Sequence, residues 1–204
     1  MATQRLAVWE DRFGAVRAEV VVTVRNTGGS PIEVALSTAT WTVTDDAGDS
    51  VASGRFAHAF PPIVEPGGEA FLIDGVSAAF AEADELAKLE VEVQGEPVDD
   101  EDGLVALDVA DVHWTSDDDG VVISGRVENP SANAVREAYA AVVLRNDRDE
   151  ILAAVYDVAI GPLGPGESRP FDTAYPGTPP VDLDEVAIAD AVASGERGTG
   201  SSAE

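Results

Sequence analysis

The sequence predicts an all-β protein built from two antiparallel β-sandwiches in tandem, and three observations predict it. Runs of β-branched residues alternate with polar ones, as in Val20 to Arg25 and Val121 to Glu128. Gly, Pro, Asp and Asn separate such runs at short intervals, as in sandwich domains. The same order of features occurs twice in 204 residues, about 100 residues apart.

The repeat is the organising feature of the chain. The matched features, in order, are Val24-Arg25-Asn26 with Val127-Glu128-Asn129, Trp41 and Val43 with Val142 and Leu144, Asp45 to Gly48 with Asn146 to Asp149, Pro66-Gly67 with Pro165-Gly166, and Leu89 and Val91 with Val186 and Ile188. Their shared order predicts that equivalent strands and turns recur in both copies.

The period of two predicts strands with one face in a core and the other in water. The acidic four-residue segments Asp45 to Gly48 and Asn146 to Asp149 are expected to form hairpin turns. Asp and Asn bond their own backbone in such turns, and Gly accepts a positive φ. One segment, Ser77 to Leu89, is rich in helix formers and predicts a short helix in a loop of the first copy. The expected core aromatics are Trp9, Trp41, Phe71, Trp114 and Phe171.

Composition shifts place the domain boundaries. Residues 1–95 are expected to form the first sandwich and residues 104–192 the second. Residues 96–103 contain Gly, Pro and several acids without a base, and predict an acidic linker. Residues 193–204 are small and polar and predict a flexible tail.

The charge balance excludes several classes of protein. The chain has 39 Asp and Glu against 12 Lys and Arg, a net charge of −27, and no cysteine. Nucleic acids and anionic membranes need a basic surface, so neither is an expected partner. Disulfides, thiolate metal sites and cysteine nucleophiles are excluded. Acids spread over both sandwiches favour a halophilic archaeon as the source, because molar salt screens the repulsion that they cause. An acidic secreted bacterial protein is the alternative.

No catalytic constellation is recognisable. The two histidines, His58 and His113, fall in different predicted domains. The chain has no metalloprotease, nucleophile-elbow or phosphate-loop motif. We therefore expect no enzymatic activity and assign no catalytic residue and no resident cofactor.

Calcium is the one ligand that the acidic turns suggest, because Ca²⁺ prefers clusters of oxygen ligands. The candidate residues are Asp99, Asp100 and Asp102 in the linker and Asp117 and Asp119 in a turn of the second copy. Neither turn matches the EF-hand loop, and acids are abundant throughout this chain. A carbohydrate platform built on tryptophan would require exposed rings, whereas the alternating patterns place these rings in the core.

In the second copy, Val121 to Asn129, Val142 to Asp147 and Leu163 to Phe171 resemble the FxLYD-type domain, and the first copy resembles it more loosely. Val121 to Asn129 is similar to the opening strand of that family, and Leu163 to Phe171 to its closing segment. Val142 to Asp147 stands at the naming motif, where it keeps Leu144 but has Val142 and Arg145 in place of Phe and Tyr. The resemblance implies an Ig-like or fibronectin-III-like sandwich, a location on the surface of a prokaryotic cell, and no catalytic residues.

These expectations favour a non-enzymatic cell-surface spacer or protein-interaction module adapted to high salt. The step Asn129-Pro130 also resembles the water-stress domain of late-embryogenesis-abundant proteins, which would make the chain a cytoplasmic stress-protective protein. A calcium- or carbohydrate-binding module is a further alternative. No apolar run reaches the roughly 20 residues that span a membrane, and no apolar signal core follows Met1. A signal or anchor would lie outside this chain. The protein partner and the oligomeric state stay open.

Overall fold

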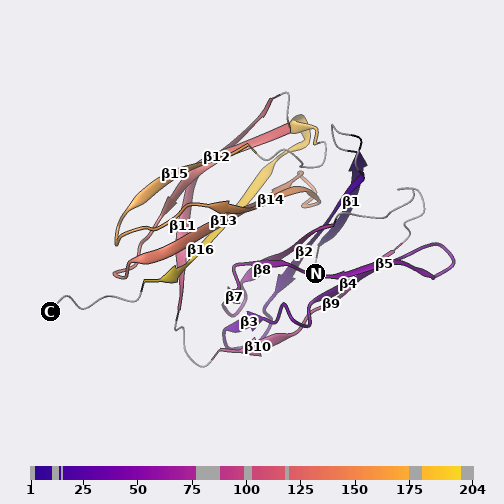
Figure 1. Cartoon of the computed structure of the whole chain (residues 1–204), viewed down its shortest axis with the longest axis horizontal. Coiled ribbons are helices and arrows are strands. Elements are labelled where there is room, and N and C mark those ends of the chain that lie inside the picture. Colours follow the sequence, from indigo (N-terminus) through magenta and orange to yellow (C-terminus); the bar gives the residue numbers. More distant parts are fainter. Residues whose placement is uncertain are drawn as a thin grey trace.

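The computed structural model describes residues 3–10, 14, 16–76, 88–98, 103–117, 120–174 and 181–198. These residues form an all-β sandwich fold of antiparallel sheets, as the sequence predicts, and contain no α-helix (Figure 1). A 3₁₀ turn spans Leu183–Glu185. The strands are β1 (Gln4–Glu10), β2 (Val16–Arg25), β3 (Ile32–Val34), β4 (Thr40–Thr44), β5 (Ser50–Arg55), β6 (His58–Phe60), β7 (Ile63–Val64), β8 (Glu69–Val76), β9 (Lys88–Glu92), β10 (Gly95–Pro97), β11 (Leu104–Asp117), β12 (Gly120–Glu128), β13 (Val135–Arg145), β14 (Ile151–Ala159), β15 (Ser168–Ala174) and β16 (Ile188–Arg197).

Strands β1 to β10 form a sandwich, called here the N-terminal sandwich. One layer is the sheet β1-β2-β8-β6, and the other consists of the sheets β5-β4-β9 and β10-β3-β7. Val20 and Val22 of β2 and Leu72 of β8 fill the space between the layers, together with Trp41 and Val43 of β4. Within each strand these residues are two positions apart, which places them on one face.

Strands β11 to β16 form the C-terminal sandwich, a six-stranded sheet in the order β14-β13-β16-β11-β12-β15 that folds over on itself. The fold-over lies within β11, because Leu104 to Leu107 pair with β16 whereas Asp108 to Asp117 pair with β12. A β-bulge follows Ala110, with Asp111 at a φ of 56°, and bends the strand near this switch. The core between the two halves of the sheet contains Ile123, Leu144, Leu163 and Phe171.

A buried asparagine follows β2 and organises the loop after it. The Nδ2 of Asn26 donates to the carbonyl oxygens of Ser30 at 2.8 Å and Val64 at 2.9 Å. Its Oδ1 accepts the N–H of Gly28 at 2.8 Å, and its main-chain carbonyl accepts the N–H of Gly67 at 2.8 Å. One side chain therefore satisfies main-chain groups of its own loop and of β7.

Asn129 makes the equivalent contacts after β12. Its Nδ2 donates to the carbonyl oxygens of Asn133 at 2.8 Å and Gly164 at 3.1 Å. Its Oδ1 accepts the N–H of Ser131 at 3.1 Å, and its carbonyl accepts the N–H of Gly166 at 2.9 Å. The two asparagines matched in the sequence repeat are therefore equivalent in structure.

We expect Asn129→Ala to lower the free energy of unfolding by about 2–3 kcal/mol, because buried carbonyl groups lose their donor. Chemical denaturation at fixed salt measures this. The control is Asn133→Ala in the same loop, where the exposed side chain makes no hydrogen bond in the described structure and the expected loss is below about 0.5 kcal/mol. Equal losses in the two variants would contradict a structural role for Asn129.

The predicted hairpin turns are confirmed. Gly48 donates its N–H to the carbonyl of Asp45 at 3.0 Å, and Asp149 donates to Asn146 at 3.2 Å. Gly48 has a φ of 87° and Asp149 a φ of 64°, so each turn places a residue in the left-handed region. Glycine and aspartate are among the residues that accept this conformation most readily.

Two of the predicted boundaries are wrong. β10 pairs with β3, so the N-terminal sandwich extends to Pro97 and not to 95. β16 continues to Arg197, so a tail does not begin at 193. The small residues from 193 onward favour a flexible tail by composition, yet those up to Arg197 lie in a strand. Gly195 is small because an added Cβ would lie 2.6 Å from the carbonyl oxygen of Glu137, which leaves no room for a side chain.

The predicted helix over Ser77 to Leu89 meets the structure only at its end. Residues 77–87 lie outside the described residues. Lys88 and Leu89 begin β9, which pairs with β4, so these two residues are extended and not helical.

Strand register corrects one match of the repeat. Val43 pairs with Leu89 in the N-terminal sandwich, and its counterpart Leu144 pairs with Ala189. Leu89 therefore corresponds to Ala189 and not to Val186. Apolar pattern alone does not fix a register, because a match a few residues away also offers an apolar residue.

The predicted core aromatics divide into two groups. Trp41, Phe71 and Phe171 are buried, whereas Trp9 and Trp114 are only partly buried. Trp41 and Phe171 lie in the cores of their own sandwiches. Phe71 is buried between the two sandwiches, in an apolar cluster that is separate from both cores.

Candidate functional site at the junction of the sandwiches

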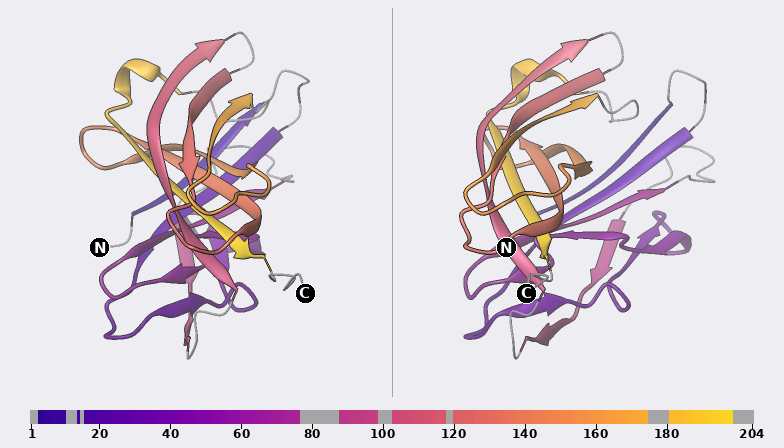
Figure 2. Two further views of the ribbon diagram at one scale, coloured as in Figure 1. Left: turned by 90° about the vertical axis from the view of Figure 1, so that its left-hand side faces the viewer. Right: turned by 60° about the vertical axis from the view of Figure 1, so that its left-hand side comes forward.

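The two sandwiches pack against each other through sheet faces. Strands β2 and β8 of one lie against β13 and β14 of the other (Figures 1 and 2). The prediction that one face of each strand meets water is therefore wrong for β2 and β13. Val20, Val21 and Val22 are at most 2% exposed, and Val142 and Val143 are 0% exposed. Strands covered on both faces show continuous apolar runs in place of alternation.

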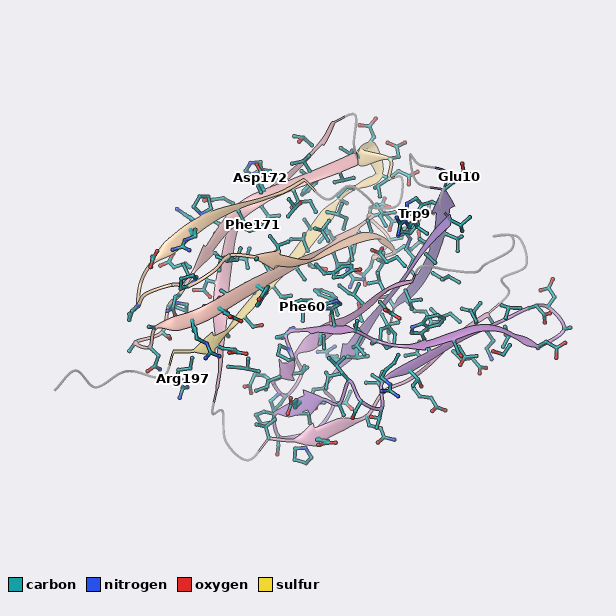
Figure 3. All side chains as sticks on the ribbon, in the orientation of Figure 1. Trp9, Glu10, Phe60, Phe171, Asp172 and Arg197 are labelled. Atoms are coloured by element: carbon teal, nitrogen blue, oxygen red, sulfur yellow. The ribbon has the colours of Figure 1, made fainter. Side chains whose placement is uncertain are left out.

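A buried apolar cluster fills this junction. It contains Val21, Phe60, Phe71 and Ile73 from the N-terminal sandwich and Ala141, Val143, Ile151 and Ala154 from the C-terminal one. Figure 3 shows Phe60 between the two sandwiches. Because both sheets contribute closely packed apolar side chains, separating the sandwiches would expose all of them to water.

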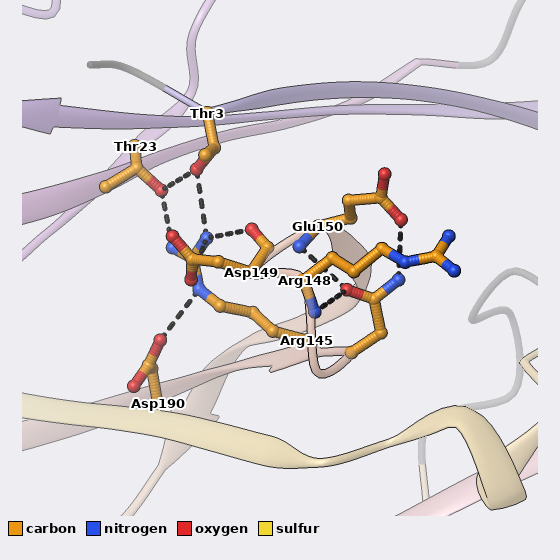
Figure 4. A network of polar contacts seen from close by, with 8 residues as sticks. Thr3, Thr23, Arg145, Arg148, Asp149, Glu150 and Asp190 are labelled. Carbon is orange, nitrogen blue, oxygen red and sulfur yellow. Dashed lines mark hydrogen bonds and ion pairs between the residues drawn. The ribbon is translucent and has the colours of Figure 1, made fainter.

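Arg145 crosses the junction from the end of β13 (Figure 4). It is 2% exposed. Its Nε donates to Oδ2 of Asp190 at 2.7 Å, its Nη2 to the hydroxyl of Thr23 at 2.7 Å, and its Nη1 to the hydroxyl of Thr3 at 2.9 Å. The guanidinium carbon lies 5.7 Å from the ring centre of Phe71, within cation–π range. One guanidinium thus joins a carboxylate of its own sheet to hydroxyls of the other sandwich.

A second charged group, Glu19 of β2, is buried at the same junction with 4% exposure. Its Oε1 lies 3.7 Å from Nη1 of Arg5 and accepts the N–H of Ala154 at 3.4 Å. Burial raises the pKa of Glu19 to about 7, and Arg5 and the N–H of Ala154 offset part of this shift. Burial also lowers the pKa of Arg5, an effect that Glu19 partly offsets. The pair is loosely joined, and only Glu19 is fully buried, because 22% of the Arg5 side chain is exposed.

Aromatic residues occupy another part of the junction. The ring centre of His58 on β6 lies 5.0 Å from the ring centre of Tyr156 on β14 and 6.0 Å from that of Phe60. The Tyr156 hydroxyl occupies the position that a Cβ on Gly75 would need. Glycine at this place in β8 therefore permits the close approach of the two sheets.

We expect Gly75→Ala to lower the free energy of unfolding by about 1 kcal/mol, because the new methyl group displaces the Tyr156 hydroxyl. In a Tyr156→Phe background, which lacks that oxygen, the same change should cost less than about 0.5 kcal/mol. A double-mutant cycle by chemical denaturation measures the coupling. Additive effects would show that the two residues do not meet across the junction.

The structure does not unite the histidines, and it leaves the calcium prediction open. His58 lies on β6, and His113 lies on β11, where its Nδ1 is 2.7 Å from the carbonyl oxygen of Asp111. Asp99, Asp100, Asp102 and Asp119 lie outside the described residues, and Asp117 is described only as the backbone end of β11. Within the residues that are described, no three potential metal ligands gather in one place.

The sequence patterns did not identify Arg145 or Glu19 as junction residues. Two signals point to them once the fold is known. Glu19 directly precedes the unbroken run Val20 to Val22, and Arg145 ends the run Ala140 to Leu144. A charged residue next to a strand that is apolar on both faces indicates a polar contact within an interface.

An apolar groove of about 270 Å³ opens at one end of the junction. One wall consists of residues 61–65 with Gly68 and Glu69, which belong to β7, its adjoining loops and the start of β8. The other wall consists of residues 104–106 of β11 with Ser194 of β16. The groove therefore exists only while the two sandwiches are packed together.

The chain matches no model of a known protein family and no curated protein. In the described residues, no helix has the length and apolar character needed to cross a membrane.

Proposed function

We propose that this chain is a non-enzymatic β-sandwich module of two Ig-like domains of the FxLYD type, which serves at the cell surface as a spacer or protein-interaction module in high salt. The observation that carries the proposal is the buried junction. Arg145 and the apolar cluster around Phe71 hold the sandwiches in one orientation. A module of this kind presents its outer surfaces at a fixed distance and angle, as a spacer or docking platform requires.

Distance measurements between the outer layers test this proposal. The chain has no cysteine, so Cys can be introduced at exposed Glu92 of β9 and Asp172 of β15 and labelled with nitroxides. Four stacked sheet layers have three spacings of about 10 Å, which gives roughly 30 Å and suits electron-electron dipolar spectroscopy. We expect a single narrow distribution. A matched pair within one sandwich, Glu128 and Asp172, supplies the reference width, and a much broader distribution across the junction would contradict a rigid body.

Salt adaptation is tested by thermal unfolding. A net charge of −27 destabilises the folded chain at low salt through self-repulsion. We expect the Tm to rise by about 10 °C or more between about 0.1 M and about 2 M KCl, where the screening length falls from ~10 Å to below ~3 Å. Sucrose solutions provide the control without ions. A Tm that does not change with KCl would reject a halophilic origin and favour the acidic secreted protein.

A further inference from the structure

The groove runs along an unpaired edge of β11. The N–H of Arg197 donates to the carbonyl of Gly103 at 2.6 Å, so the odd-numbered residues at this end of β11 bond to β16. Leu104 and Ala106 therefore direct their N–H and C=O groups away from β16. Among the described residues, β12 pairs with β11 only from Asp108 onward. This short stretch of main chain is open to a further strand.

The groove borders the main chain at the free edge of β11 as well as the side chains on its sheet face. Leu104, Val105 and Ala106 all line it, although successive side chains of a strand point to opposite faces. The main chain of β11 is therefore part of the wall. Pro61 and Ile63 form the opposite wall, so an added strand would place its side chains against apolar residues of the N-terminal sandwich.

The charge of the groove selects its occupant. The only ionisable residues in the lining are Glu65 and Glu69, both exposed and without an ion pair in the described structure. Arg25 lies opposite Glu69 in the sheet, but its Nε donates to the carbonyl of Gly67 at 3.1 Å. A ligand with apolar and cationic side chains on one face matches these walls.

We propose that the groove binds an extended, basic peptide segment of a partner protein, which adds as a strand to the free edge of β11 at Leu104 and Ala106. Main-chain hydrogen bonds to β11 hold the segment. An apolar side chain enters the groove between the sandwiches, and a Lys or Arg two positions away meets Glu65 or Glu69. The inference rests on the proposed interaction module and names the class of its partner.

The probe is the peptide Thr-Lys-Thr-Leu-Thr-Lys-Thr-amide, with fluorescein attached to its N-terminus so that both lysines stay charged. Its Lys and Leu side chains share one face of a strand, and the pattern is the same in both chain directions. Fluorescence anisotropy in about 1 M KCl suppresses non-specific attraction to the acidic chain. We expect saturable binding with a Kd below about 1 mM. Absence of binding at that concentration overturns the assignment.

Alternate N-methylation tests strand addition. Methylating the amides at even positions gives one peptide, and methylating those at odd positions gives another. Only one set of N–H groups faces β11, so we expect one peptide to bind at least about tenfold more weakly and the other within about twofold. Equal binding of both peptides, with competition by hexylammonium, would indicate a small amphiphilic cation as ligand and overturn the proposal.

Protein variants locate the contact. Ala106→Trp fills the groove and should abolish binding, whereas Ala110→Trp, on the same strand beyond the groove, should not. At about 0.15 M KCl, where charges are screened less, Glu65→Gln with Glu69→Gln should weaken binding about fivefold or more. Glu92→Gln with Asp172→Asn removes the same charge elsewhere and should change it less than about twofold. Equal effects of the two charge pairs would overturn a specific site.

The peptide site and the proposed function of the whole chain can be tested separately. If the probe fails while the distance distribution across the junction stays narrow and the Tm rises with salt, the groove assignment is wrong and the proposed function stands. Sedimentation in about 1 M KCl tests the remaining occupant. Self-association that Ala106→Trp abolishes would identify a second copy of this chain in the groove, and would also overturn the peptide proposal.

Discussion

Replacing Arg145 with alanine is expected to lower the free energy of unfolding by about 3 kcal/mol, and the Tm by about 6–12 °C. The change removes the partner of Asp190, and it leaves the hydroxyl of Thr23 with one donor, the Thr3 hydroxyl, in place of two. It also removes the cation from the ring of Phe71. Denaturant titration in high salt measures the loss, because salt screens an interaction shielded from water much less than one at the surface.

The matched control is Arg136→Ala. Arg136 forms an ion pair with Glu196 on the surface of the same sandwich, where the side chains are 62% and 50% exposed. Exposed pairs of this kind contribute little to stability, because water and salt screen them. Arg145→Lys should recover only part of the loss, because an ammonium group lacks the planar array of donors that reaches Asp190, Thr3, Thr23 and Asp149. If the alanine variants of Arg145 and Arg136 lose the same stability, Arg145 does not hold the junction.

Glu19→Gln is expected to stabilise the protein at about pH 8 by about 3 kcal/mol and to have little effect at about pH 4. Burial raises the pKa of Glu19 to about 7 from an ordinary value of 4.5, so the folded state binds its proton more tightly than the unfolded state does. The stability from this group is therefore fully present below about pH 4.5 and is lost as the pH rises through about 7. Glutamine keeps the shape and has no proton to lose.

The measurement is unfolding by denaturant over this pH range for both proteins. Glu92→Gln removes the same negative charge from an exposed position on β9, which accounts for the general relief of repulsion. The difference between the two variants isolates the buried carboxyl group. If Glu19→Gln is the less stable protein at about pH 8, the ionised pair with Arg5 contributes more than burial costs, and the predicted sign is wrong.

Local sequence patterns predicted the strands, loops and turns whose conformation depends on residues close by in the sequence. Alternation gave the strands, and the paired asparagines Asn26 and Asn129 marked equivalent loops, because each side chain bonds groups close by in the sequence or in the adjoining loop. The turn that ends at Gly48 followed from the φ that glycine accepts.

The junction could not be predicted in the same way. Thr23 and Arg145 are 122 residues apart in the sequence, and only packing of the two sheets brings them together. The second face of β2 is buried only because β13 and β14 cover it. The amino-acid pattern of β2 does not say which other strands lie against that face. The run Val20 to Val22 shows that both faces are apolar without showing what covers the outer one.

The two-sided burial of β2 and β13 also restricts how this chain can evolve. A repeated domain is usually a portable unit that can be copied, deleted or moved alone. Here each copy depends on the other to cover Val21 on one side and Val143 on the other, so either half expressed alone would expose an apolar sheet face. The heritable unit is the pair. We expect substitutions to be tolerated best in the outer layers, β5-β4-β9 and β12-β15, which face away from the shared boundary.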